Sequence, residues 1–134
     1  MKILIMGLPG SGKSTLAKSL HELLPNSVWL NADHIRRTYN DWDFSLEGRL
    51  RQAARLRKFA DVCDDIAILD FVCPLPETRT IVNADMVVWL DTISHSRFKD
   101  TDKMFVPPDK YDYKITSFEE SVWSDIISKI YSLL

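Results

Sequence analysis

Near-continuous runs of apolar residues alternate along the chain with segments in which apolar residues recur at helical spacing. The apolar runs predict five strands, at residues 2–6, 28–30, 66–71, 86–90 and 113–115. Continuous runs, as opposed to alternating apolar and polar positions, are typical of strands buried on both faces. The order of strands and helices therefore predicts an α/β fold with a doubly wound, five-stranded parallel sheet flanked by helices.

Helical spacing predicts helices at residues 13–24, 46–63 and 77–82, and in a C-terminal segment that carries Val122, Ile126 and Ile130. Ser45 is expected to cap the second helix, and Ser117 with Glu120 to form a capping box at the start of the last. Residues 91–112, with two consecutive prolines, predict a long loop, and loops of that length are usually functional or disordered.

The composition is that of an ordinary globular domain, with 46% hydrophobic and 27% charged residues among 134. That length predicts one domain, residues 1–134, with one core. A net charge of −2 provides no global field for wrapping nucleic acid or for binding an anionic membrane. The apolar runs are too short for a membrane span and no signal peptide is visible, so we expect a cytoplasmic protein whose Cys63 and Cys73 are reduced thiols.

Three of the four glycines fall in the segment GLPGSGKST, between the first predicted strand and the first predicted helix. This is the P-loop pattern GxxxxGK[ST] in the strand–loop–helix context that it requires. Glycine lets the backbone turn its N–H groups inward, and the helix N-terminus adds positive potential, so the loop suits phosphate. The alternative is a glycine-rich turn with an exposed lysine. The residues expected to bind ATP are Gly7, Pro9, Gly10, Ser11, Gly12, Lys13, Ser14 and Thr15.

The chemistry at the phosphates depends on two residues of this loop and one acid. Lys13 is expected to reach the β and γ phosphates, and the Ser14 hydroxyl to ligate Mg²⁺. Asp70 ends the third apolar run, where it could hold the metal or a metal-bound water; alternatively it caps the turn that follows. The sequence lacks the NKxD pattern of GTPases and the length of motor ATPases, which leaves a small kinase.

Asp33 and Arg36 lie just past the second predicted strand, at the edge where open α/β sheets bind ligands. A carboxylate there can accept a proton from an attacking hydroxyl, and an arginine can hold an anionic acceptor. Alternatively, Asp33 caps a helix and Arg36 is solvated. Seven of the seventeen basic residues fall between Arg36 and Lys58; some must form an ordinary solvated face, yet such a concentration suits phosphate or sulfate.

These segments make the sequence similar to the adenylylsulfate kinases, P-loop enzymes that transfer the γ-phosphate of ATP to the 3′-hydroxyl of adenosine 5′-phosphosulfate. GLPGSGKSTLA resembles the family's P-loop, LNADHIR resembles its LDGDNVR, and WDFSLEGRLRQAARL its GFSxxDRxENIRRV. FVCPLPETR resembles the family's FISPxxxxR, and KMFVPPDKYD a shortened form of its KxFTGIxxPYE lid segment.

The resemblance implies roles on the acceptor side. Asp33 would be the catalytic base or a carboxylate close to the metal, and Arg36 and Arg49 would grip the phosphosulfate of the acceptor. Phe44 and Phe105 would sandwich its adenine, although a phenylalanine taken alone more often packs in a core. The resemblance also implies a homodimer.

Four positions depart from the family's pattern. Asn31 replaces the first acid of its DGD, Gly48 replaces an Asp, Gln52 stands where the family has an acceptor-contacting Asn, and Cys73 replaces a serine. Gln52 can make the same amide contacts from one methylene further out. The charges missing at Asn31 and Gly48 could otherwise organise the metal and the arginines.

Residues 94–112 are expected to close as a lid that excludes water, so that ATP is not hydrolysed. The segment is shorter than the family's lid, so Arg97, Lys99 and Lys103 cannot be matched one to one with its cations. Arg97 follows the fourth predicted strand most closely, and we expect it to stabilise the transferring phosphoryl group.

The sequence is compatible with three functions. The first is a kinase that makes 3′-phosphoadenosine 5′-phosphosulfate from a small-molecule nucleotide acceptor. The second keeps the chemistry but phosphorylates a hydroxyl of a polynucleotide or modified base, which the arginine-rich helix favours and the acidic net charge disfavours. The third is a nucleotide-binding module without activity. It is suggested by Asn31, Gly48 and the reduced lid, and it is opposed by the intact set of Lys13, Ser14, Asp33 and Asp70.

Overall fold

The computed structural model describes all residues, 1–134. The strands are β1 (Lys2–Gly7), β2 (Ser27–Asn31), β3 (Ile66–Asp70), β4 (Met86–Leu90) and β5 (Tyr113–Ile115). The helices are α1 (Lys13–Leu23), α2 (Ala32–Tyr39), α3 (Leu46–Asp61), α4 (Pro76–Val82), α5 (Lys99–Met104) and α6 (Glu120–Leu133). All strand pairs are parallel, in the order β2-β3-β1-β4-β5, which confirms the predicted doubly wound sheet.

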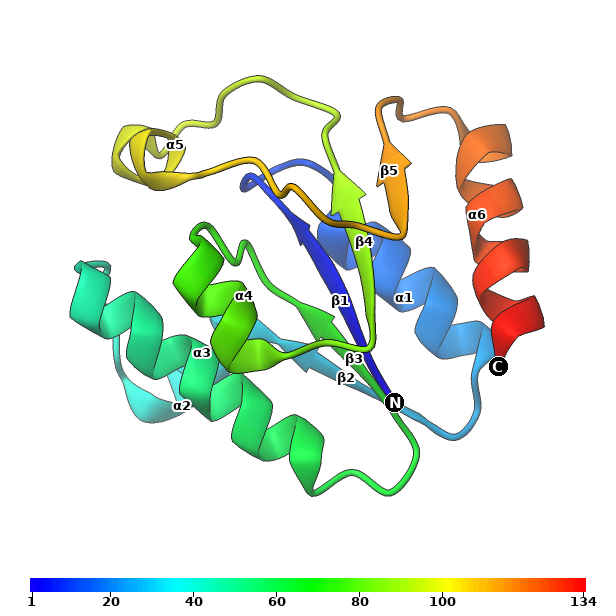
Figure 1. Cartoon of the computed structure of the whole chain (residues 1–134), viewed down its shortest axis with the longest axis horizontal. Helices are drawn as coiled ribbons and strands as arrows, with labels where there is room; N and C mark the ends of the chain where they lie inside the picture. Colours follow the sequence, from blue (N-terminus) through cyan, green and yellow to red (C-terminus); the bar gives the residue numbers. More distant parts are fainter.

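The sheet is covered on both faces, by α1 and α6 on one and by α2, α3 and α4 on the other (Figure 1). Ile3 and Ile5 of β1 belong to the core cluster that includes α1 and α6. Leu4 and Met6, which point the other way, belong to the cluster on the opposite face. Burial of successive side chains on opposite faces explains why this strand is a continuous apolar run.

Because the strands are parallel, their carboxyl ends meet at one edge of the sheet. Gly7 at the end of β1 is in register with Leu90 of β4, and Asn31 of β2 is in register with Asp70 of β3. The loop from β1 to α1 and the helix α5 also lie at this edge (Figure 1). Ligands of open α/β sheets bind at this edge, so the fold places the candidate residues together.

Two helices were not predicted. The structure begins α2 directly after β2, with Asn31 as the N-cap: its side chain accepts a hydrogen bond from the backbone of His34. The alternative in which Asp33 caps this helix is therefore wrong, because Asn31, two positions earlier, takes that role. The short α5 lies inside the segment expected to be a loop, and its mostly charged sequence KDTDKM gives no apolar period.

The helix caps agree with the sequence in one case and not in another. Ser45 caps α3 as expected, accepting a hydrogen bond from the backbone of Gly48. The capping box of Ser117 and Glu120 is wrong, since α6 begins only at Glu120 and the Ser117 hydroxyl accepts from the backbone of Glu119 instead. Ser117 therefore belongs to the turn before the helix.

No helix in the structure has both the length and the apolar character needed to cross a membrane. Cys63 and Cys73 are both free, and Cys73 is fully buried.

Candidate functional site

The loop between β1 and α1 is compact because two of its glycines occupy places that other residues could not. A Cβ on Gly7 would lie 2.5 Å from the carbonyl oxygen of Leu90, so glycine lets the loop lie against the end of β4. Gly12 caps α1 with φ of 104°, in the left-handed region that disfavours other residues. The Thr92 hydroxyl donates to the carbonyl of Ser11 at 2.8 Å and fixes the loop from the other side.

Lys13 lies across this loop. Its Nζ donates a hydrogen bond to the carbonyl oxygen of Leu8 at 3.0 Å. Burial lowers the pKa of Lys13, and the carboxylates of Asp70 and Asp33 oppose that shift. The lysine, the acid of β3 and the acid of α2 are therefore close enough for their charges to interact.

Asp70 receives three hydrogen bonds on a single oxygen. Its Oδ2 accepts from the hydroxyl of Ser14 at 2.7 Å, from Nε1 of Trp29 at 3.3 Å and from Nδ2 of Asn31 at 3.2 Å. Burial raises the pKa of Asp70, while the hydrogen bond from Ser14 and the charge of Lys13 act in the opposite direction. The carboxylate accepts no hydrogen bond from the following turn, so the alternative role as a turn cap is wrong; the side chain points across the sheet edge instead.

Asp33 is exposed on the first turn of α2 and makes no hydrogen bond or ion pair with its side chain. Arg36, one helical turn later, is only 4% exposed, so the alternative in which it is solvated is wrong. Ile35 and Arg36 are on the buried side of the helix. The Arg36 guanidinium donates hydrogen bonds to two backbone carbonyls of the loop that follows α2. The two residues thus present an open carboxylate and a buried cation on the same helix.

Arg36 and Arg49 meet at the aromatic ring of Phe44. The guanidinium carbons lie 4.2 Å and 5.4 Å from the centre of that ring. Arg36 donates hydrogen bonds to the backbone carbonyls of Asp41 and Asp43. Arg49 donates to the backbone carbonyl of Phe44 and to the hydroxyl of Thr101. Burial lowers the pKa of both arginines. Neither arginine forms a direct ion pair, although the carboxylates of Asp41 and Asp100 lie near enough to act on the charges of Arg36 and Arg49 respectively.

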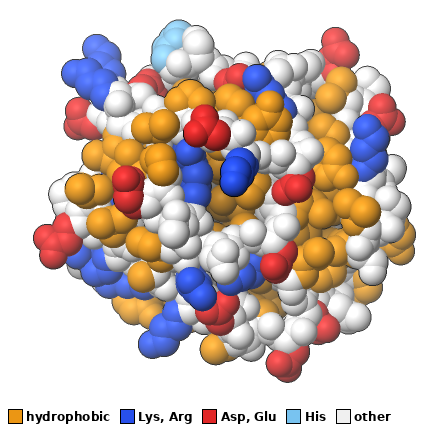
Figure 2. Space-filling model, in the orientation of Figure 1, with side chains coloured by type: hydrophobic (Ala, Val, Ile, Leu, Met, Phe, Trp, Pro, Cys, Tyr) orange, Lys and Arg blue, Asp and Glu red, His pale blue; other side chains and the backbone are white.

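The other arginines of α3 are paired. Arg51 and Arg55 both form ion pairs with Asp41, at 2.8 Å and 2.7 Å, and Arg57 pairs with Asp61 at 3.2 Å. On the face seen in Figure 2, basic and acidic side chains are interspersed and form no continuous basic surface. Of the predicted concentration of basic residues, only part is therefore free to attract an anion.

Gly48, one of the departures from the family pattern, has a steric cause. A Cβ at this position would lie 2.1 Å from the carbonyl oxygen of Asp43. An aspartate there would displace the loop that holds Arg36 and Arg51. Gly48 therefore lacks the charge of the family's aspartate, but it lets this loop lie closer to α3 than an aspartate would allow.

Gln52 is 1% exposed and lies next to α2. Its Nε2 donates to the carbonyl of Ala32 at 2.7 Å, whereas its Oε1 is buried without a partner. A buried amide oxygen without a donor is costly, and a donor group on a ligand would satisfy it. This position is where the sequence placed an acceptor contact.

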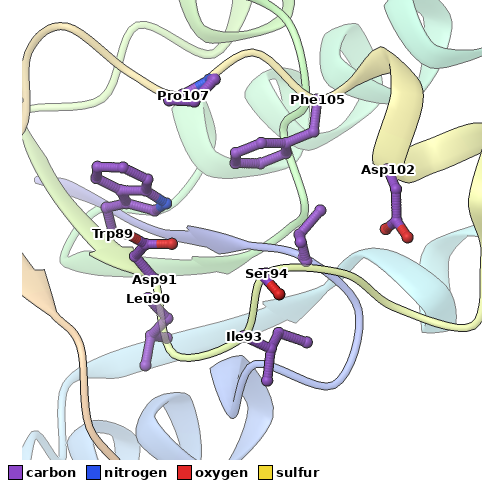
Figure 3. A pocket seen from close by; sticks show the side chains of 9 residues that line it. Trp89, Leu90, Asp91, Ile93, Ser94, Asp102, Phe105 and Pro107 are labelled. Atoms are coloured by element: carbon purple, nitrogen blue, oxygen red, sulfur yellow. The ribbon is translucent and has the colours of Figure 1, made fainter.

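A pocket opens between the end of β4 and α5 (Figure 3). Its lining is Leu8, Trp89, Leu90, Asp91, Ile93, Ser94, Asp102, Phe105 and Pro107. The rings of Trp89 and Phe105 lie on two sides of it, and the loop after β4 forms another wall (Figure 3). Phe44 does not line this pocket, so the structure does not bring the two expected phenylalanines together into one sandwich.

The lid segment reaches the arginine pair through one contact. Arg49 Nη2 donates to the hydroxyl of Thr101 in α5 at 3.0 Å, and Phe105 directly follows this helix. Arg97 is exposed, with its guanidinium carbon 5.0 Å from the centre of the Phe98 ring, and it makes no hydrogen bond or ion pair. The structure therefore brings Arg49 and α5 together and leaves Arg97 apart from the other site residues.

Sequence reasoning missed two groups of residues at this site. Trp29 and Asn31 contact Asp70, and no motif marked the indole as a partner of the acid. Phe118 and Trp123 lie against the phosphate loop: a Cβ on Gly12 would be 2.6 Å from the Trp123 ring and 3.5 Å from that of Phe118. The apolar period that predicts α6 includes Val122, Ile126 and Ile130 but not Trp123.

Solved structures with the same fold include kinases with different acceptors. The Mycobacterium tuberculosis APS kinase CysC in complex with AMPPNP and APS has a TM-score of 0.75 at 20% identity, covering 97% of this chain and 96% of that chain. Chaetomium thermophilum Kti12 in complex with ADP-AlF3 has a TM-score of 0.73 at 16% identity, covering 98% of each chain. Shikimate kinase from Acinetobacter baumannii in complex with shikimate has a TM-score of 0.64 at 19% identity, covering 98% of this chain and 91% of that chain.

None of the curated proteins matches the sequence. The model of the family described as AAA domain (AAA_33) matches residues 3–69, which is half of the chain and includes the phosphate loop, Asp33, the arginine pair and most of β3. The chain therefore belongs to this AAA domain family, and its fold is that of the P-loop kinases.

Proposed function

We propose that the protein is a kinase that transfers the γ-phosphate of ATP to a hydroxyl group of a small anionic acceptor, the 3′-hydroxyl of adenosine 5′-phosphosulfate. The observation that carries the proposal is the pair Arg36 and Arg49. Both guanidiniums are buried, lie at one aromatic ring and form no direct ion pair, so a bound anion would offset their mutual repulsion, and their planar forks suit phosphate and sulfate. The similarity to an APS kinase solved with APS supports this acceptor.

On the donor side, the backbone N–H groups of the phosphate loop and Lys13 would hold the phosphates. A bound phosphate would replace the Leu8 carbonyl as the partner of Lys13, because an anion is the better acceptor for an ammonium group. Positioning and charge neutralisation account for most of the catalysis in phosphoryl transfer. Lys13 would supply charge at the transferring group, and Asp33 would accept the proton of the attacking hydroxyl.

Two residues beside the phosphate loop have side chains that suit Mg²⁺. The Ser14 hydroxyl donates a hydrogen bond to Asp70, which leaves the lone pairs of the hydroxyl oxygen free for a metal, and Asp70 adds a carboxylate. Mg²⁺ is usually bound through one or two protein oxygens together with substrate phosphates, and Ser14 and Asp70 would supply such oxygens. When bound, Mg²⁺ neutralises charge on the phosphates.

The acceptor would bind between α2, α3 and α5. Arg36 and Arg49 would hold its anionic groups, and the unpaired Oε1 of Gln52 would accept a hydrogen bond from it. Phe105 would contact its base from the pocket, and Phe44, with 48% of its surface exposed, would contact the acceptor beside the two arginines. In this scheme α5 is the lid, and its contact with Arg49 couples lid position to acceptor binding.

An assay with several acceptors tests the proposal. The protein would be incubated with Mg·ATP and either adenosine 5′-phosphosulfate, shikimate or a short oligonucleotide, and ADP and phosphorylated product would be measured. We expect product only with the sulfonucleotide. Product with shikimate would retain the kinase and replace the acceptor, product with the oligonucleotide would favour a polynucleotide kinase, and no product with any of them would contradict the proposed activity.

A further inference from the structure

Asn31, at the end of β2, uses both atoms of its side-chain amide. Its Oδ1 accepts a hydrogen bond from the backbone N–H of His34 at 3.0 Å, and its Nδ2 donates to Oδ2 of Asp70 at 3.2 Å. Because a backbone N–H can only donate, the amide oxygen must face α2 and the amide nitrogen must face Asp70. One side chain thus joins the helix to the carboxylate.

The two ends of this link belong to different halves of the proposed site. Asp70 lies with Ser14 on the donor side, where the metal would bind. The first turn of α2 carries Asp33, and its next turn carries Arg36, both on the acceptor side. A shift of the carboxylate is therefore transmitted by a hydrogen bond to the N-terminus of the acceptor helix.

Trp29 completes the arrangement. With Ser14 and Asn31 it directs three donors at Oδ2 of Asp70, while Oδ1 accepts no hydrogen bond from the protein. Donors on one oxygen fix the rotation of a carboxylate, and they leave the other oxygen for a metal or its water. An acid at position 31 would instead place a second carboxylate about 3 Å from Asp70, where like charges repel.

We propose that Asn31 is a positioning residue that holds Asp70 for the metal and couples metal·nucleotide binding to α2. This inference rests on the proposed function. Serine at position 31 can still cap α2 but is too short to reach Asp70 with a donor, so Asn31→Ser separates positioning from capping. Trp29→Phe removes the second donor and leaves the cap intact.

The first test measures ADP affinity by calorimetry with Mg²⁺ and with EDTA. We expect Mg²⁺ to strengthen ADP binding to the wild type, and Asn31→Ser and Trp29→Phe each to reduce this enhancement by about three- to tenfold, the effect of one ordinary hydrogen bond. The matched control is Ser45→Ala, which removes the cap of α3 away from Asp70 and should keep the full enhancement. Full enhancement in Asn31→Ser would overturn the proposal.

The second test follows hydrogen exchange in the first turn of α2. Mg·ADP should slow exchange there in the wild type, whereas in Asn31→Ser the basal protection should persist and the additional slowing should disappear. Equal slowing in both proteins would contradict the coupling. It would show that the helix responds without the amide of Asn31.

A third measurement is independent of nucleotide. The indole N–H resonance of Trp29, assigned through its loss in Trp29→Phe, should shift in ligand-free Asn31→Ser because Asp70 has lost one of its donors. An unchanged resonance would overturn the proposal even if the wild type does not bind ADP. Absence of ADP binding to the wild type, by contrast, would count against the proposed function.

Discussion

The arginines of α2 and α3 differ in role, because they have different partners. Arg51, Arg55 and Arg57 lie in ion pairs, whereas Arg36 and Arg49 are buried without a carboxylate. Exposed ion pairs contribute little to stability, but two buried cations that lie together without a direct ion pair favour binding of an anion. The distinction depends on where the loop after α2 places Asp41 and Asp43, which residue spacing alone does not show.

Lys13→Ala should lower turnover with every acceptor, because the lysine acts on the phosphates of the donor. We expect a decrease in kcat of about a hundredfold or more, comparable to the loss of one preorganised charge at the transferring group. Lys18→Ala, an exposed lysine on the same helix, provides the control. Equal activity of the two variants in a steady-state ADP-release assay would exclude Lys13 from the chemistry.

Cys73 should be unreactive in the native protein. Burial raises the pKa of its thiol to about 12, so at pH 8 only about one molecule in ten thousand carries the thiolate. Alkylation with iodoacetamide followed by mass spectrometry should modify Cys63, which is partly exposed, and should reach Cys73 only after denaturation. Rapid modification of Cys73 in the folded protein would contradict its described burial.

At the scale of elements, α6 supports the phosphate loop through Trp123. A Cβ on Gly12 would lie 2.6 Å from this ring, which is too close, whereas a Cβ on Gly10 would meet only Ile93, at 3.9 Å. Both glycines have positive φ, so alanine at either position costs about 1–2 kcal/mol in backbone strain. Gly12 carries an additional steric restriction.

Gly12→Ala should therefore destabilise the protein more than Gly10→Ala does, in urea unfolding followed by circular dichroism. Replacing Trp123 by Leu in the Gly12→Ala background should recover part of the difference, since the obstructing ring is gone. The two alanine variants would be equally stable if Trp123 did not press on the loop. No recovery in the double variant would lead to the same conclusion.

Elements with a strong apolar signal were predictable, and those defined by polar contacts were not. All five strands occur where the apolar runs placed them, and α1, α3 and α4 agree to within about two residues. The short helix α2 was not among the predicted helices and was raised only as the alternative in which Asp33 is the cap; its actual N-cap, Asn31, is the last residue of the strand itself. The charged helix α5 has no apolar face to reveal it, and Ser117 matched a capping pattern without lying at a helix start.

At the scale of the whole molecule, parallel topology brings the donor and acceptor residues to one edge of the sheet. The sequence could predict this convergence because every candidate follows a strand or a loop at that edge. The sequence could not predict which side chains from distant segments contact one another in the site. The link from Asp70 to α2 through Asn31, the contact of Arg49 with Thr101 and the separation of Phe44 from the pocket of Phe105 all arise from side-chain packing between distant segments.

The affinity for adenosine 5′-phosphosulfate in the presence of Mg·ADP shows most directly whether the guanidiniums of Arg36 in α2 and Arg49 in α3 bind an anionic acceptor. Calorimetry would compare the wild type with Arg49→Ala and with Arg57→Ala, the paired arginine on the same helix. Arg49→Ala should raise the Kd of the sulfonucleotide by about tenfold or more and leave the Kd of ADP nearly unchanged, while Arg57→Ala changes neither. Equal acceptor affinity in all three proteins would contradict the account.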